Sequence, residues 1–503
     1  MSTITQAIPE LDEHDGEHEE IDLDIGDPQV NFYPPLHLQR RIWILDICRR
    51  EGITELLDVG CGEGQLLSVL AQPATWLSPL PDMERFSYKT EVPNLHMKRI
   101  TGLDVSAADL AFAVKDTKPP SSGDADEQMY GLRVTRFEDL EVKIFKGALE
   151  TMNPDFVGVE CIVCTEVIEH LPPETLPALA PMLLGIYSPK RLLITTPSYT
   201  FNARFTRPSA PREQRARQGF LDPTGRTDRI FRHPDHKFEW TVDEFHAWCG
   251  QTADEWDYEL EEMAGIGRPL EDDPWGRDEE LGDASFVVSF RRKDGVVDRA
   301  DKARRVLEAL KLDGKPHELL ATHHHEAHES AGKPGSTDAI AAMVKTKMEE
   351  LRDAIVPLEQ LWFDPAVSTL CGGFIEVLIR AVEESAGLTL LRPTEGSKEW
   401  SIEIVGGIKD AMGSFWTEGF AEADCSLDLI PDGWMPGQDP DDGYEEEDTE
   451  SSSLSTTGAD GDASWNGSQS ENGESWGKNA DAWSGPVSSW EDGGGWGEQV
   501  HSD

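Results

Sequence analysis

Three side chains able to hold a metal ion stand close together in the segment 165–171. Glu166, Glu169 and His170 are spaced i, i+3 and i+4, so on a helical turn they share one face. Two carboxylates and one imidazole suit Mg²⁺ or Mn²⁺, and the imidazole favours Mn²⁺. The segment follows a strand-like apolar run, so we expect a metal site at the carboxyl edge of a sheet. The alternative is a histidine that only steers a substrate.

A second segment, 231–241, is dense in histidine, acidic and aromatic residues and precedes a helical pattern at Val242–Trp248. It can supply a fourth ligand to the same metal ion. Of its two candidates, we favour His236 over His233. The alternative is that both are ordinary loop histidines.

A glycine-rich turn follows the first apolar strand. Gly60, Gly62 and Gly64 let the backbone turn tightly and approach a ligand closely. Asp58 before the turn and Glu63 inside it would repel a phosphate and suit a sulfonium or an amino group. This D-x-G-x-G-x-G form resembles the S-adenosylmethionine loop of class I methyltransferases. A purely structural glycine turn is the alternative.

The next strand ends at Asp104, whose carboxylate can bridge the two hydroxyls of a ribose. The 40-residue interval from Gly64 to Asp104 is longer than usual, and a Pro-rich insertion at Ala71–Met97 accounts for it. The expected cofactor-binding residues are Asp58, Gly60, Gly62, Gly64, Asp104, Ser106 and Thr165.

Strand-like and helical runs alternate as far as about residue 292, and they must position these side chains. The strand-like runs are Glu55–Val59, Arg99–Asp104, Val142–Lys146, Glu160–Cys164, Arg191–Thr195 and Ser285–Phe290. Such alternation predicts an α/β fold with a doubly wound, mostly parallel sheet of the class I methyltransferase type. The stretches Ala71–Met97 and Lys118–Gln128 are interpreted as surface insertions.

Four regions are expected along the chain: a disordered acidic arm (1–30), the methyltransferase-like domain (31–293), a linker with a small, mainly helical region of unknown role (294–435) and a disordered acidic tail (436–503). Helices are predicted at Asp301–Leu312 and Thr337–Ile355. The second helix carries an apolar stripe and has Ser336 or Thr337 as its N-cap. The histidines 323–325 and 328 are interpreted as part of a solvated polar linker, with metal binding as the alternative.

The formal net charge is −51 over 503 residues, which argues against a general nucleic-acid binder. Seven scattered cysteines favour a reducing compartment, so we expect a cytoplasmic protein, with the nucleus left open. Cys161 and Cys164 form a C-x-x-C in an apolar run and are interpreted as core residues. No apolar run reaches about 18 residues and no signal sequence is recognisable, so no membrane association is expected. We expect a monomer.

Four segments together resemble the small-RNA 3′-terminal 2′-O-methyltransferase family of the Hua-enhancer type. The resemblance covers roughly residues 32–292, and its most specific part is Asp235-His236-Lys237-Phe238-Glu239-Trp240-Thr241. The other parts are Phe32-Tyr33-Pro34-Pro35 with Gln39-Arg40-Arg41, then Glu166-Val167-Ile168-Glu169-His170, and Thr196-Pro197-Ser198-Tyr199-Thr200-Phe201-Asn202. Two residues depart from the pattern: Lys146 stands where an acid is expected, and Ser198 where asparagine is more usual.

The resemblance implies a metal-dependent transfer of methyl from S-adenosylmethionine to the 2′-OH of the 3′-terminal nucleotide of small RNAs, which protects them in RNA silencing. By position, it implies Glu166, Glu169, His170 and His236 as metal ligands and catalytic residues, with His170 or His236 as the base. A metal on both terminal oxygens would activate the 2′-OH and select RNA ends.

One stretch, Lys190–Lys237, is basic within this acidic chain, with 11 basic and 4 acidic residues. Its arginines can meet phosphates near an RNA 3′ end. The expected RNA-binding residues are Arg40, Arg41, Arg204, Arg207, Arg212, Arg215 and Arg217. A solvated surface loop is the alternative for the stretch.

The tail carries five tryptophans in acidic, Ser/Gly-rich sequence: Trp465, Trp476, Trp483, Trp490 and Trp496. They resemble the Gly-Trp hooks that dock into tryptophan pockets of Argonaute proteins. Tryptophan is a favoured anchor, and several anchors on one segment raise the effective concentration of each at its pocket. Low-complexity drift is the alternative. Two other functions compete with the RNA methyltransferase: a class I O-methyltransferase of a small metabolite, and an Argonaute-binding scaffold with an inactive enzyme domain.

Overall fold

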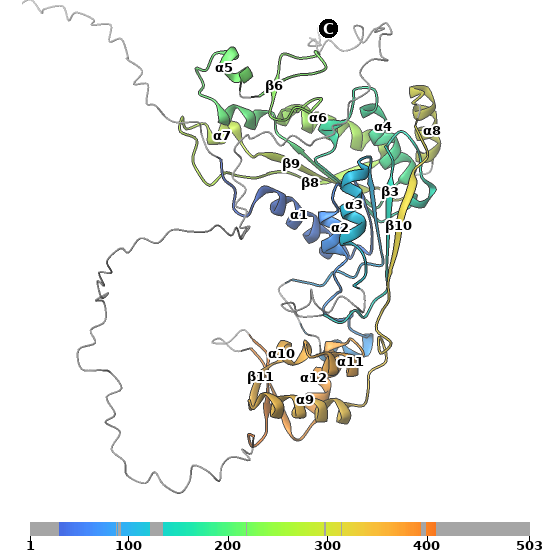
Figure 1. Cartoon of the computed structure of the whole chain (residues 1–503), viewed down its shortest axis with the longest axis vertical. Coiled ribbons are helices and arrows are strands. Elements are labelled where there is room, and N and C mark those ends of the chain that lie inside the picture. Colours follow the sequence, from blue (N-terminus) through green and yellow to red (C-terminus); the bar gives the residue numbers. More distant parts are fainter. Residues whose placement is uncertain are drawn as a thin grey trace, which may run out of the picture. The chain divides into compact units, whose positions relative to one another are not determined.

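The computed structural model is built around an eight-stranded sheet with the strand order β10-β3-β2-β1-β4-β5-β9-β8 (Figure 1). The strands from β3 to β5 are parallel, whereas β9 and β10 run antiparallel to their neighbours. The strands are β1 Glu55–Val59, β2 Arg99–Asp104, β3 Leu140–Lys146, β4 Cys161–Thr165, β5 Arg191–Pro197, β8 Tyr258–Ile266, β9 Ser285–Arg292 and β10 Glu318–His325. With an antiparallel β9 between β5 and β8, this is the class I methyltransferase fold, as predicted.

The structure describes residues 30–86, 88, 92–120, 134–217, 219–295, 298–312, 314–393 and 399–408. They belong to one compact unit, Met1–Ile408. The expected acidic arm up to residue 29, most of the insertion at 118–128 and the whole tail from 436 lie outside the described residues. None of the described helices is both long enough and apolar enough to cross a bilayer.

Helices cover both faces of the sheet. Helices α1, α2 and α3 pack on one face, and α4, a π-helical segment, α6 and α8 pack on the other. Neighbouring residues of one strand point to opposite faces, so Leu56 joins the first layer and Leu57 the second. The helices are α1 Leu36–Glu51, α2 Gln65–Leu70, α3 Ala107–Asp116, α4 Leu176–Ala180, α5 Arg212–Arg217, α6 Val242–Trp256, α7 Asp278–Leu281 and α8 Arg299–Leu310, with the π-helical segment at Pro181–Tyr187.

The six predicted strands correspond to β1, β2, β3, β4, β5 and β9. Cys161 and Cys164 are fully buried in the core, as expected. Strand β8 was not predicted because acidic side chains interrupt its apolar pattern. Its acids form ion pairs with residues of β5 and α1: Glu261 with Arg191 at 2.5 Å and Glu262 with Arg50 at 2.7 Å.

Strand β10 corrects the interpretation of the histidine run. Residues 323–325 do not lie in a polar linker but in an edge strand that pairs with β3. His323 and His325 each bond through Nε2 to a backbone carbonyl at the end of α3, those of Val114 and Thr117, both at 2.9 Å. The strand was missed because its polar composition hides the alternation that an edge strand shows. The sheet therefore extends beyond residue 293, where the first domain was expected to end.

A second lobe follows β10 and is mainly helical. Its helices are α9 Thr337–Leu351, α10 Leu358–Trp362, α11 Pro365–Leu370 and α12 Ile375–Glu384, and its small sheet has the order β11-β13-β12, with bounds Ile355–Pro357, Ser401–Ile404 and Leu388–Leu391. The Pro-rich insertion contributes to this lobe: Met83 and Phe86 are buried in its core, and Trp362 donates to the carbonyl of Thr75 at 2.8 Å. The insertion is thus not the simple surface loop that its composition predicts.

Helix α9 begins at the predicted N-cap, where Ser336 accepts from the backbone N–H of Ala339 at 3.3 Å. It ends at Leu351, four residues earlier than predicted, and Ile355 begins β11 instead. The predicted apolar stripe consists of Ile340, Val344, Met348, Leu351 and Ile355. The first three are buried, but Leu351 and Ile355 are half exposed.

Candidate active site

A sharp turn after β4 positions the acidic residues of the expected metal site. Glu166 has a positive φ of 54° and is held by Thr195, whose hydroxyl donates to its Oε1 at 2.8 Å. A short 3₁₀ turn, Ile168–His170, follows, and the buried Ile168 anchors it in the core. This geometry directs Glu169 inward, where its side chain is fully buried.

Only one of the two oxygens of the Glu169 carboxylate has a hydrogen-bond partner. Its Oε2 accepts from the Thr196 hydroxyl at 3.0 Å, whereas its buried Oε1 has no hydrogen-bond partner. That oxygen lies 4.0 Å from Nε2 of His170. Burial, and then repulsion by Glu166, raises the pKa of Glu169. A buried acceptor without a donor is costly, so this oxygen is suited to a cation.

Glu166 is engaged elsewhere. Its Oε2 forms an ion pair with Arg40 at 2.6 Å, and the same guanidinium donates to the hydroxyl of Ser285 at 2.6 Å. Arg40, expected to contact RNA or solvent, thus lies inside the site. Glu166 would have to exchange this arginine for a metal ion.

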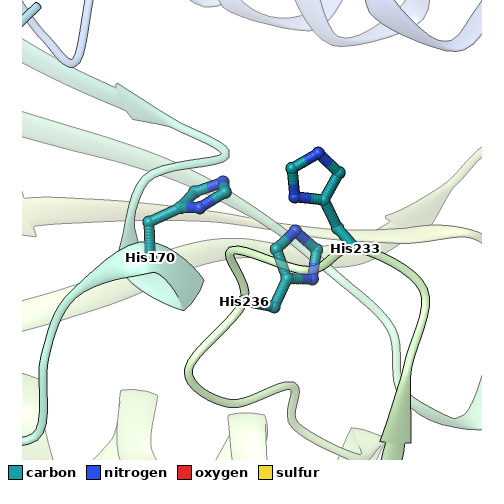
Figure 2. A group of neighbouring side chains, drawn as sticks. All are labelled: His170, His233 and His236. Atoms are coloured by element: carbon teal, nitrogen blue, oxygen red, sulfur yellow. The ribbon is translucent and has the colours of Figure 1, made fainter. Parts of the chain in front are cut away.

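Three histidines from two segments meet beside Glu169. The ligand atoms of His170, His233 and His236 all lie within 4.8 Å of one another, and Figure 2 shows the three rings gathered around a common space. In the described part of the chain, no other three metal-binding side chains come together in this way. The sequence analysis favoured His236 over His233 as a metal ligand, but the structure places the two histidines side by side.

Burial keeps the imidazole of His170 neutral. Burial, followed by the nearby rings of His236 and His233, lowers the pKa of His170 to about 4. The pKa of His233 is also lowered, first by burial and then by the ring of His236. Neutral imidazoles present the lone pairs that a metal ion requires.

A carboxylate that the sequence interpretation did not single out orients His236. The Nδ1 of His236 lies 2.6 Å from Oε1 of the buried Glu239, which also accepts from the side-chain amide of Asn202. This contact fixes the ring and turns Nε2 towards the other histidines, as partners of metal-binding histidines do. A carboxylate three residues after a candidate histidine was the signal available in the sequence. The N–H of Lys237 donates to the Glu169 carbonyl at 2.7 Å and ties the two segments together.

The glycine-rich turn lies beside this site. Asp104 organises it: one carboxylate oxygen accepts from the N–H of Gly62 at 2.9 Å, and the other from the N–H of Ser106 at 2.8 Å. Ser106 caps α3 by accepting from Asp109. The predicted cofactor residues Asp58, Gly60, Gly62 and Thr165 line one cavity of about 260 Å³, together with Glu63, Arg40 and Arg41.

Each glycine of the turn has a positive φ, but their surroundings differ. A Cβ on Gly60 would lie 2.2 Å from the Val167 side chain, and one on Gly64 would lie 2.7 Å from Ala113. A Cβ on Gly62 would meet nothing within 4 Å. Gly60 and Gly64 therefore allow close packing, whereas Gly62 leaves space beside the cavity.

Two polar groups that line this cavity are suited to contact a ligand. The buried Thr165 hydroxyl has no hydrogen-bond partner. Burial, and secondarily the charge of Asp104, raises the pKa of Asp58 to about 7. A ligand with a positive charge and hydrogen-bonding groups fits such a cavity.

The expected RNA-binding arginines do not form one surface. Arg204 is buried and pairs with Asp278 at 2.8 Å, so it cannot face a phosphate, contrary to expectation. Arg212, Arg215 and Arg217 are exposed on α5. Arg41 donates to Gln65 at 3.1 Å at the cavity, and Arg207 is half-buried.

Comparison with known proteins identifies relatives that match about half of the chain. A small RNA 2′-O-methyltransferase from Arabidopsis thaliana is 28% identical over 270 residues, which are 53% of this chain and 24% of that protein. One from Gallus gallus is 26% identical over 264 residues, 52% of this chain and 56% of that protein. About half of the chain is similar to small RNA 2′-O-methyltransferases.

This chain matches about a quarter of the length of the first relative and just over half of the length of the second. A crystal structure of a small RNA methyltransferase is 24% identical to it and covers 59% of this chain and 29% of that one, with a TM-score of 0.39. No protein-family model matches the chain.

Proposed function

We propose that this protein transfers a methyl group from S-adenosylmethionine to the 2′-OH of the 3′-terminal nucleotide of small RNAs, with the help of a divalent metal ion. The observation that carries the proposal is the pair of acceptors at the turn after β4. Oε1 of Glu169 and Nε2 of His170 face each other at 4.0 Å, and the carboxylate oxygen has no donor. Both residues would hold a divalent cation, which would act there as a Lewis acid.

The cofactor would occupy the cavity at the glycine-rich turn. Asp104, at the edge of the turn, would accept from ribose hydroxyls, and Asp58, Glu63 and Thr165, which line the cavity, would hold the charged amino-acid end. S-adenosylmethionine would supply an activated methyl group, so the protein's main task is to position the nucleophile. The space beside Gly62 and the unpartnered Thr165 hydroxyl support this placement.

The proposed metal residues are Glu166, Glu169, His170 and His236. A bound Mg²⁺ or Mn²⁺ would lower the pKa of the terminal 2′-OH and favour RNA ends with a free 3′-OH. Glu239 holds His236 in one orientation, and the neutral imidazole of His170 keeps a lone pair for an ion or a proton. Protection of small RNAs in silencing would follow from such terminal methylation.

A methylation assay with defined RNA ends tests the proposal. Short RNA ending in free 2′- and 3′-hydroxyls is incubated with labelled cofactor, with and without Mn²⁺ or Mg²⁺. We expect metal-dependent label and an end that resists periodate. Equal labelling of RNA that ends in a 3′-phosphate or a 2′-deoxyribose would contradict the proposal. Transfer to small metabolites but not to RNA would favour the alternative enzyme.

Cofactor affinity is expected to depend on pH through Asp58. Because the pKa of Asp58 is raised to about 7, its carboxylate is mostly neutral below that pH and charged above it. A cationic ligand prefers the charged form, so affinity should rise about tenfold between about pH 6 and pH 8. Calorimetric titration with S-adenosylmethionine measures this. Asp58→Asn should bind S-adenosylmethionine more weakly and lose this pH dependence. If its affinity changes with pH as that of the wild type does, Asp58 is not the group responsible.

RNA binding is expected to involve the exposed arginines of α5. Replacing both Arg215 and Arg217 by alanine should weaken binding of single-stranded RNA and reduce the log–log salt slope by about 0.7 for each phosphate that is no longer neutralised. The control is a double alanine variant of Arg304 and Arg305, which are exposed on α8. Equal salt slopes for the two variants would exclude α5 from the RNA interface.

The tryptophan-rich tail lies outside the described residues, and its docking to an Argonaute-type protein is a proposal from sequence. Deletion of residues 436–503 should abolish Argonaute binding and leave methylation of free RNA intact. Undiminished Argonaute binding by the truncated protein would refute it.

A further inference from the structure

A two-stranded ribbon leads into the loop that carries His233, and neither the glycine-rich turn nor the proposed metal site includes it. Its strands, β6 Phe220–Leu221 and β7 Ile230–Phe231, are antiparallel, and Phe220 pairs with Phe231. Helix α5 packs against β6, as Figure 1 shows. Because His233 follows β7 after only one residue, the ribbon is continuous with the candidate active site.

The ring of Phe220 has an open surface and lies next to the site. Paired residues of neighbouring strands share a face, so Phe220 lies on the same face as Phe231, which is buried with its ring centroid 6.4 Å from that of Tyr199. Phe220 itself is 44% exposed. Leu221 points to the opposite face and is 55% exposed.

Backbone reach limits how far this ring can be from the histidines. Two residues span at most about 7 Å along the chain, and the Cα atoms of a strand pair lie up to about 5.5 Å apart. The Cα atoms of Phe220 and His233 are therefore within about 13 Å of each other. Stacked nucleotides of one strand are about 3.4 Å apart, so this distance corresponds to at most about four nucleotides.

The ribbon is held in one shape by its own side chains. At its tip, Asp222 accepts from the N–H and hydroxyl of Thr224 at 2.8 and 2.6 Å, and from those of Thr227 at 2.9 and 2.7 Å. Just before β7, Arg229 forms an ion pair with Glu244 of α6 at 2.7 Å. A ligand therefore meets a surface that is already ordered, which lowers the entropic cost of binding.

The surroundings of Phe220 are basic although the chain as a whole is strongly acidic. Residues 212–232 contain six arginines and three acidic residues, against a net charge of −51 for the whole chain. Four of these arginines are exposed: Arg212, Arg215, Arg217 and Arg226. An aromatic ring among exposed arginines is the combination by which proteins bind single-stranded nucleic acid, because the ring stacks on a base while the cations meet phosphates.

We propose that Phe220 stacks on a base within about four nucleotides of the RNA 3′ end, while the exposed arginines of α5 and the ribbon hold the adjoining phosphates. The inference rests on the proposed function and specifies how RNA is held near its end. Stacking on the ring needs the free face of a base, so this part of the RNA is single-stranded. Because every base has such a face, the contact tolerates any sequence.

Binding of a short, labelled single-stranded RNA to the full chain tests the inference, with fluorescence anisotropy as the readout. Phe220→Ala should weaken binding by about 5- to 100-fold without changing the log–log salt slope, because stacking neutralises no phosphate. Phe220→Trp should restore binding, whereas Phe220→Leu, which is apolar but has no ring, should behave like Phe220→Ala. Leu221→Ala is the matched control, because it shortens a side chain of the same strand on the opposite face.

RNAs with a single abasic nucleotide at each of the last four positions locate the stacked base. One of them should bind the wild-type chain as weakly as the intact RNA binds Phe220→Ala, and Phe220→Ala should bind that RNA no more weakly still. Such non-additive losses show that ring and base act on each other. Losses that multiply at every position would show that Phe220 contacts no base, and the inference would be wrong.

Two other results would also overturn the inference, and they differ in what else they affect. If Phe220→Ala binds RNA like Leu221→Ala while the wild-type chain methylates RNA ends, Phe220 has no part in RNA binding and the proposed function stands. If Phe220→Ala loses affinity for a poly-glutamate peptide but not for RNA, the ribbon binds an acidic protein segment instead. A wild-type chain that neither binds nor methylates RNA would contradict the proposed function as well.

Discussion

Replacing Glu169 by glutamine is expected to reduce metal-dependent methyl transfer to RNA by about a hundredfold or more, since a metal ion contributes several kcal/mol of activation in such reactions. Glutamine keeps the shape of the side chain and the hydrogen bond to Thr196, but it lacks the charge at the unpartnered oxygen. The metal-free protein should be no less stable, because glutamine replaces a buried carboxyl group whose charged form is disfavoured there. The measurements are the rate with labelled RNA and the melting temperature with and without Mn²⁺.

The chain offers a close control for this variant. Glu376 on α12 is equally buried, also has an unpartnered Oε2, and has a raised pKa caused mainly by burial. It lies in the second lobe, away from the histidines. Glu376→Gln should therefore preserve both the activity and the rise in melting temperature on adding Mn²⁺. Equal activity of the two glutamine variants would show that Glu169 is not a metal ligand.

Gly60→Ala is expected to disturb both the glycine-rich turn and the turn after β4. The new methyl group would stand 2.2 Å from Val167, the residue between Glu166 and Ile168, and the backbone would keep a φ of 76° that alanine tolerates poorly. Strain of about 1–2 kcal/mol and overpacking of about 1–3 kcal/mol should lower the free energy of unfolding. Denaturant unfolding measures this loss, and calorimetry with S-adenosylhomocysteine measures the accompanying loss of affinity.

Gly62→Ala separates strain from contact. Its φ of 51° imposes a similar backbone cost, but the added methyl group meets no atom within 4 Å. We expect it to be destabilised by about 1–2 kcal/mol only. Restoration of stability in Gly60→Ala by Val167→Ala would show that the contact matters. Equal destabilisation of the two glycine variants would mean that Val167 adjusts without cost.

The parts of the fold that were predictable depend on short-range pattern. A central strand such as β4 is a nearly continuous apolar run, and a turn with three glycines has few structural uses. The edge strands β8 and β10 escaped prediction because one side of each is open, so acids and histidines occur in them without penalty. Their assignment depends on partners that are remote in sequence.

The site was predictable to a similar degree. The spacing of Glu169 and His170 places them on one turn, and the motif around His236 suggests a common site. Sequence order does not show that Arg40, more than 120 residues earlier, neutralises Glu166. Nor does it distinguish His233 from His236, because only the path of the loop decides which rings face His170.

The pairing of β10 with β3 has a consequence for folding during synthesis. Strand β3 is complete once residue 146 is made, but its outer edge gains its partner only when residues 318–325 have left the ribosome. Until then the nascent chain carries an open row of backbone donors and acceptors, the kind of edge that promotes aggregation. A fragment ending at residue 293, where the first domain was expected to end, would keep that edge permanently exposed. Such fragments should include β10.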